Sequence, residues 1–109
     1  MITVRFGDCS CAVNGHAGAG DYGQDLVCAA VSALTLSLAS AARALKRQRL
    51  REIYVEPGQA SIRCLPGLGG RRDAETVFFA AGVGFSRLAQ LYPEFIRVSG
   101  IEKAEKDGV

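Results

Sequence analysis

The longest apolar-rich segment, residues 26–45, places the strongest constraint on the fold. Its apolar side chains recur every three or four residues, a spacing that lines up one face of an α-helix. Asp25 precedes the segment and is a favourable helix N-cap. Serines, a threonine and a cysteine interrupt the run, so we expect a buried helix that packs on a sheet and not a membrane span. The expected apolar face contains Leu26, Val27, Ala30, Val31, Leu34, Leu38, Ala42 and Leu45.

Two pairs of segments, one before and one after this helix, alternate apolar and polar residues. That period is typical of strands with one buried face. The first pair, residues 2–6 and 9–13, is interrupted by Gly7-Asp8, and the second, residues 53–55 and 60–64, by Pro57-Gly58. Each pair is therefore expected to form a hairpin. Three cysteines occupy apolar positions of these alternating segments and are expected to point into the core: Cys9, Cys11 and Cys64.

A second helix is expected from about Asp73 to Leu91, because an acidic residue stands at its start and Tyr92-Pro93 follows its end. Gly82 and Gly84 would weaken it in isolation, so close packing must support it. Its apolar positions are Val77, Phe78, Ala81, Phe85, Leu88 and Leu91.

The order strand–strand–helix–strand–strand–helix, with a short last strand optional after residue 94, predicts the fold class α+β. We expect a two-layer arrangement in which a small, mostly antiparallel sheet carries both helices on one face. The 109 residues suffice for one domain. We place it at residues 1–100, followed by a frayed polar tail at residues 101–109.

Composition narrows the class of protein. An apolar share of 49% excludes a disordered chain. A net charge of +2 is too small to indicate a nucleic-acid binder on its own. The chain also has eleven acidic residues and no aromatic-basic binding signature, so we expect no direct nucleic-acid binding. The basic run at residues 43–51 is interpreted as a solvated helix end, where cations complement the negative end of the helix dipole. No basic and apolar leader precedes residue 2, so we expect a cytoplasmic protein with reduced cysteines.

The chain's one histidine, His16, and Cys28 are the candidate catalytic pair. His16 is expected where a strand ends. Cys28 lies three residues after Asp25, which places it in the first turn of the expected helix. Free N–H groups and partial positive charge at a helix start favour a thiolate. A histidine brought alongside would complete a nucleophile–base pair.

The glycine-rich connection between this pair is expected to approach a bound ligand closely, because glycines let backbone N–H groups come near. Its candidate residues are Gly18, Gly20, Tyr22 and Gly23.

Two simpler interpretations compete with catalysis. A loop histidine is usually only solvated, and a cysteine on a helix is more often a small apolar residue than a nucleophile. A zinc site built from Cys9, Cys11, His16 and Cys28 is disfavoured, because the spacing matches no zinc ribbon or finger and the strand pattern turns Cys9 and Cys11 away from His16. We expect no metal ion and no cofactor.

The motif Gly15-His16-Ala17, followed by Gly23-x-Asp25-Leu26-Val27-Cys28-Ala29-Ala30-Val31-Ser32-Ala33-Leu34, resembles the bacterial ribosomal-processing cysteine protease family, Prp. Tyr92-Pro93 with a short apolar strand resembles the family's C-terminal end. The resemblance implies His16 as general base, Cys28 as nucleophile, and Asp25 and Ser32 as supporting residues.

The family also implies a cytoplasmic endopeptidase that removes a short N-terminal extension from a large-subunit ribosomal protein during ribosome assembly. Its implied partners are that precursor and a second copy of the chain, as a homodimer, with no membrane. The alternative from a different class is a non-catalytic, ribosome-associated binding module. In either case the basic run is a candidate for guiding the chain toward a ribosomal surface.

Overall fold

The computed structural model describes residues 1–15 and 22–100, and for residues 22–25 it describes the backbone alone. The order ββαββαβ confirms the expected α+β class. The division between a domain and a tail stays a prediction, because residues 101–109 lie outside the described residues. The elements are β1 (Ile2–Gly7), β2 (Ser10–Asn14), α1 (Tyr22–Ala44), β3 (Gln48–Glu56), β4 (Gln59–Pro66), α2 (Arg71–Leu91) and β5 (Ile96–Ser99).

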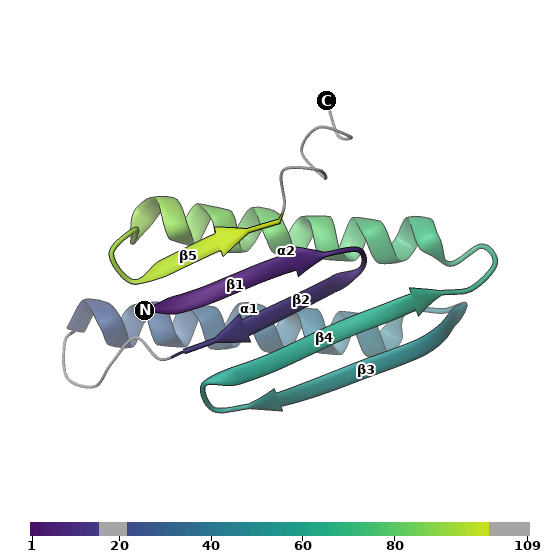
Figure 1. Ribbon diagram of the computed structural model, residues 1–109, viewed down its shortest axis with the longest axis horizontal. Helices are drawn as coiled ribbons and strands as arrows, with labels where there is room; N and C mark the ends of the chain where they lie inside the picture. The colour runs from purple at the N-terminus through teal and green to yellow at the C-terminus, as the bar shows by residue number, and fades with distance from the viewer. Residues whose placement is uncertain (16–21, 101–109) are drawn as a thin grey trace.

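The five strands form one sheet in the order β3-β4-β2-β1-β5. Both expected hairpins, β1–β2 and β3–β4, are present, and β2 pairs antiparallel with β4. The optional last strand is also present, and it pairs parallel with β1. Both helices lie on the same face of the sheet, behind the strands in Figure 1. α1 packs on β3 and β4, and α2 packs on β4 and β5.

The core forms where the inner faces of the strands meet the two helices. On β4 the buried residues Ala60, Ile62 and Cys64 alternate with exposed ones, as the sequence period predicts. Cys9 and Cys11 are buried too, which confirms their inward direction. Cys9 itself lies in the turn between β1 and β2 and has a φ of 47°, so its expected place on a strand is wrong.

The buried stripe of α1 is narrower than expected. Leu26 is 44% exposed, because the helix directs Val27 and not its neighbour toward the sheet. On α2, Leu91 is 65% exposed, since it is the last residue of the helix. The buried residues of α1 are Val27, Val31, Thr35, Leu38, Ala39 and Ala42, and those of α2 are Ala74, Phe78, Gly82, Phe85 and Leu88.

The glycines of α2 let the two helices approach closely. Gly82 is buried, and a Cβ added at Gly84 would lie 3.1 Å from a methyl carbon of Leu34 on α1. Packing therefore supports this helix as expected, and it offsets the low intrinsic helix propensity of glycine.

Both helices begin before the residues chosen as caps. α1 starts at Tyr22, so Asp25 is its fourth residue and not its N-cap. α2 starts at Arg71 after Gly70, and Asp73 lies in its first turn. An aspartate is favourable both as an N-cap and within the first turn, where its charge meets the positive end of the dipole. For that reason its presence does not fix where a helix starts.

A cation does complement the end of α1, as expected, but it comes from the next strand. Arg51 on β3 donates from Nε to the carbonyl oxygen of Ala42 at 3.0 Å and from its guanidinium to that of Leu45. These bonds satisfy carbonyl groups that a helix end leaves without partners. They also tie β3 to the helix.

The segment Leu26–Ala44 of α1 is long and apolar enough to cross a membrane by length and composition alone, with a mean hydropathy of 1.6. Core helices of soluble proteins share these properties, so this is weak evidence for a span. Here the buried stripe packs on β3, β4 and α2, which is the packing of a core helix.

We expect Phe85→Ala to lower the free energy of unfolding by about 3–5 kcal/mol, since the substitution leaves a cavity in the core. Phe85 is completely buried and its ring meets that of Phe6 edge-on, with centroids 5.9 Å apart. Phe79→Ala on the same helix is the matched control, because Phe79 is 41% exposed. Urea unfolding of both variants measures the difference, and equal losses would contradict the assigned core.

Candidate active site

A largely apolar cavity of about 410 Å³ lies between α1 and the turn of the β3–β4 hairpin. Residues from four separate stretches of the chain close around it, so the tertiary fold creates it and no single segment does. It is lined by Ile2, Val13, Gly15, Cys28, Val31, Ser32, Thr35, Leu36, Val55, Glu56, Pro57, Gly58, Gln59 and Ala60.

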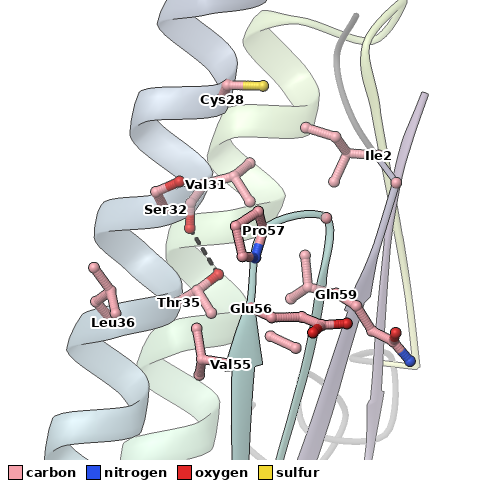
Figure 2. Close-up of a pocket in the computed structure, with 14 residues that line it drawn as sticks. Ile2, Cys28, Val31, Ser32, Thr35, Leu36, Val55, Glu56, Pro57 and Gln59 are labelled. Atoms are coloured by element: carbon pink, nitrogen blue, oxygen red, sulfur yellow. Dashed lines mark hydrogen bonds between the residues drawn. The ribbon is translucent and has the colours of Figure 1, made fainter.

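One face of α1 forms the first wall, which begins at Cys28 and ends at Leu36. These residues are three or four apart and so lie on one side of the helix. Figure 2 shows Cys28 at one end of this row and Leu36 at the other. Thr35 is the buried polar residue of the wall, and its hydroxyl donates to the carbonyl oxygen of Val31 at 2.7 Å. That bond satisfies the Thr35 hydroxyl, so the wall offers carbon atoms, the Cys28 sulfur and the hydroxyl of Ser32.

The hairpin turn forms the facing wall. Figure 2 shows Pro57 opposite Val31, with Val55 farther along toward Leu36. Glu56 contributes the carboxylate of this wall. The Tyr54 hydroxyl donates a hydrogen bond to the Glu56 carboxylate, and this bond raises the pKa of Tyr54.

Gly15 joins the end of β2 to this wall. Its N–H donates to the carbonyl oxygen of Gly58 at 2.9 Å. Its φ of +102° is a conformation that side chains rarely adopt, and a Cβ there would collide with the carbonyl oxygen of Met1. The position therefore requires glycine, and it holds the chain at the edge of the cavity directly before residue 16.

Cys28 is half-buried and lines this cavity, but it does not lie in the first turn of α1. It is the seventh helical residue, so its N–H belongs to the regular helical ladder. The free N–H groups and the strongest dipole effect are confined to about the first turn. The expected stabilisation of a thiolate by the helix start is therefore wrong in that form.

The remaining predicted site residues divide into two groups. Ser32 lies one turn after Cys28 and lines the same cavity, while Tyr22, Gly23 and Asp25 belong to the first turn of α1, where the backbone alone is described. The predictions for His16, Gly18 and Gly20 fall outside the described residues.

Leu36 and the residues of the hairpin turn also line the cavity but are not among the site residues predicted from the sequence. Counting in steps of four from Cys28 reaches Ser32 and Leu36, so helical periodicity could have found the first wall. Nothing in Pro57-Gly58 beyond a turn indicates that this hairpin faces α1.

The other three cysteines differ from Cys28 in their surroundings. Burial raises the pKa of Cys9 and Cys64 and raises that of Cys11 to about 12. Among the described residues, no three histidine, cysteine, aspartate or glutamate side chains lie close enough together to hold a metal ion. Of the four cysteines, Cys28 alone lines the cavity, so its thiol is the accessible one.

The family comparison identifies what kind of protein has this arrangement. The family model described as "Cysteine protease Prp" matches residues 1–97. The chain belongs to the Prp cysteine protease family. It is accordingly a cysteine-type peptidase, and Cys28 is the cysteine that its fold leaves open to a cavity. The comparison with curated proteins found no match.

Solved structures of other bacterial proteins share the fold. The essential ribosomal processing protease Prp from S. aureus, with a covalently linked product peptide, is 28% identical with a TM-score of 0.71, covering 91% of this chain and 98% of that one. Its complex with a substrate peptide gives 24% identity and a TM-score of 0.71, covering 90% and 95%. SMU.848 from Streptococcus mutans is 32% identical with a TM-score of 0.65, covering 90% and 88%.

We expect iodoacetamide at pH 7.5 to alkylate Cys28 alone in the folded protein. Burial shields the other three thiols and raises their pKa values, which lowers the fraction of each that is the reactive thiolate. Peptide mass spectrometry before and after unfolding in urea measures each site. Cys28→Ser should remove the native label, and alkylation of Cys11 at the rate of Cys28 would contradict the assigned geometry.

Proposed function

We propose that this peptidase removes a short N-terminal extension from a large-subunit ribosomal protein during ribosome assembly. The observation that carries the proposal is the accessible thiol of Cys28 in an apolar cavity of a chain from the Prp family. The S. aureus relative, described as a ribosomal processing protease and bound to peptides, supports the choice of substrate. The family match favours this function over the non-catalytic binding module.

In the proposed mechanism Cys28 is the nucleophile and His16 is the general base. Gly15, which lines the cavity, is the residue covalently joined to His16. Cys28 lies beyond the first turn of α1, so the free N–H groups of the helix start do not stabilise its thiolate. The proposed source of that stabilisation is an imidazolium partner. Asp25 and Ser32 are proposed as supporting residues, and Ser32 lies one turn from Cys28 on the cavity wall.

The reaction follows thiol protease chemistry. The thiolate sulfur attacks the scissile carbonyl carbon, and backbone N–H groups hold the tetrahedral oxyanion. The imidazolium of His16 gives its proton to the leaving amine as the C–N bond breaks and a thioester forms. His16 then takes a proton from water, whose oxygen attacks the thioester carbonyl and releases the acid and the thiol. Donors from the first turn of α1 or from residues 17–21 are proposed for the oxyanion.

The cavity walls support an apolar substrate segment. Beyond Cys28, carbon atoms of Val31, Leu36, Val55 and Pro57 line the cavity. Enclosing one apolar side chain among them would contribute about 1.5–3 kcal/mol to binding. The thiol stands at one end of this row, so the scissile bond is proposed to lie there while the apolar side chain occupies the cavity.

Cys28→Ala is expected to reduce kcat/KM by at least about a thousandfold for a peptide that spans the processing site, because no other nucleophile forms the thioester. His16→Ala should cause a loss of similar size. Ser37→Ala, an exposed position on the same helix outside the cavity, is the matched control and should keep wild-type activity. Mass spectrometry of the products, together with urea unfolding, gives the readout. Cleavage by a folded Cys28→Ala variant would refute the assignment.

A homodimer in the cytoplasm is proposed alongside this activity, on the family resemblance. Sedimentation equilibrium of the purified chain between 1 and 100 µM, roughly the range where weak dimers dissociate, measures its mass. A dimer is the expected result, and a mass of 11.5 kDa throughout would show a monomer.

A further inference from the structure

Five exposed cations gather at the end of the molecule where α1 ends and α2 begins. In Figure 1 the end of α1, the start of β3, the end of β4 and the start of α2 all lie at one end of the long axis. We refer to these five residues as the basic end: Arg43, Lys46, Arg47, Arg49 and Arg72.

Two hydrogen bonds hold two parts of the chain together at this end. The N–H of Gly67 donates to the carbonyl oxygen of Arg47 at 2.8 Å. The side chain of Gln48 donates to the carbonyl oxygen of Gly70 at 2.9 Å. The segment that carries Arg47 and Arg49 is therefore bound to the loop that leads into α2 and Arg72. Cations separated by more than twenty residues thus share one surface.

The fold gives other cations nearby an internal partner but leaves the basic end without one. Arg71 pairs with Asp8 at 3.0 Å and with Glu75 at 3.6 Å, and Arg63 pairs with Glu52 at 2.6 Å. Among residues 1–15 and 22–100, no ion pair involves any member of the basic end. Like charges held close without internal partners favour an external polyanion.

Asp73 is the acidic residue nearest to this surface in the chain, directly after Arg72. It lines a cavity with Lys46, yet the two do not form an ion pair. The local excess of positive charge therefore persists although the whole chain carries only +2.

We propose that the basic end binds the phosphate backbone of structured RNA. The choice of RNA rests on the proposed function, because the polyanion that a ribosomal protein binds during assembly is RNA. Four of the five cations are arginines, whose planar guanidinium binds phosphate oxygens in pairs. The basic end as defined contains no aromatic residue on which a base could stack. The expected contact is therefore to phosphates and independent of base sequence. The expectation of no direct nucleic-acid binding rested on the eleven acidic residues and on the missing aromatic-basic signature, and neither shows how the fold distributes charges.

The position of the basic end keeps the peptidase cavity open. Cys28 and Ala44 are sixteen residues apart on one helix, which corresponds to about 24 Å along its axis. RNA bound at one end would leave the thiol at the other end accessible to a peptide. The contact therefore increases the local concentration of substrate and does not take part in the chemistry.

A membrane surface fits this end less well. Leu68 is completely exposed in the loop before α2. A single leucine contributes about 1.5–3 kcal/mol when buried, less than stable membrane attachment requires. Anionic lipid is therefore treated as an outcome of the experiment.

The experiment measures the affinity of the full chain for a 20-base-pair RNA duplex (roughly one dsRNA-binding footprint) by fluorescence anisotropy at several salt concentrations. Arg49→Gln with Arg72→Gln is expected to weaken binding at least about tenfold and to reduce the slope of log K against log salt by about 2, one for each lost phosphate contact. Arg5→Gln with Arg97→Gln on the sheet is the control. It removes the same charge from exposed positions outside the basic end, and should retain the wild-type slope.

Several results would overturn the proposal. They are equal losses in the two double variants, undetectable binding by the wild type, equal affinity for polyglutamate, or tighter binding to phosphatidylserine vesicles than to RNA. Cleavage of a short peptide separates this proposal from the peptidase function. The Arg49/Arg72 variant should keep wild-type kcat/KM on that peptide. A wild type that binds RNA as described but cuts no peptide would refute the proposed function alone.

Discussion

The packing of α1 on the sheet is the contact on which both the core and the site depend. Val27, Val31 and Leu38 are buried against the strands, and the buried hydroxyl of Thr35 is satisfied within the helix. Cys28 follows Val27 directly, so burying that valine fixes the direction in which the thiol points. Burial of this apolar stripe is thus sufficient to orient the Cys28 thiol. A rotation of the helix would expose the valines and move the thiol out of the cavity at once.

The cavity also depends on a second contact, between the end of β2 and the β3–β4 turn. The Gly15–Gly58 hydrogen bond at 2.9 Å joins two chain segments more than forty residues apart. Gly15 makes this contact in a conformation that a side chain would strain. Gly15 thus fixes the edge of the cavity, while α1 forms part of the core and one wall of the same cavity.

The fold could be predicted from the sequence where one physical rule governed a whole segment. Alternation identified the hairpins and the inward cysteines, and helical spacing identified α1 and α2. Prediction failed where one residue type is favourable at two different structural positions. Asp25 suits both a cap and a first turn, so the start of α1 and the surroundings of Cys28 were misjudged. Likewise, Pro57-Gly58 encodes a turn but carries no information on what the turn faces. Cavities formed by residues distant in sequence follow from tertiary packing, which local patterns do not contain. The predicted role of His16 lies outside the described residues and stays a prediction.

The misjudged start of α1 changes how reactivity at Cys28 must arise. A thiol in the first turn would gain from free N–H groups, but the seventh residue of a helix has its own N–H already bonded. Burial disfavours a thiolate at Cys9, Cys11 and Cys64, whose pKa values it raises. Cys28 is half-buried and lines the cavity, and the imidazolium of His16 is the proposed source of thiolate stabilisation there. Cys28 lies in the early part of α1. The other end of this helix, where Arg51 donates to the carbonyl oxygen of Ala42, lies beside the basic end. One rigid element therefore sets both the direction of the nucleophile and its separation from the charged surface.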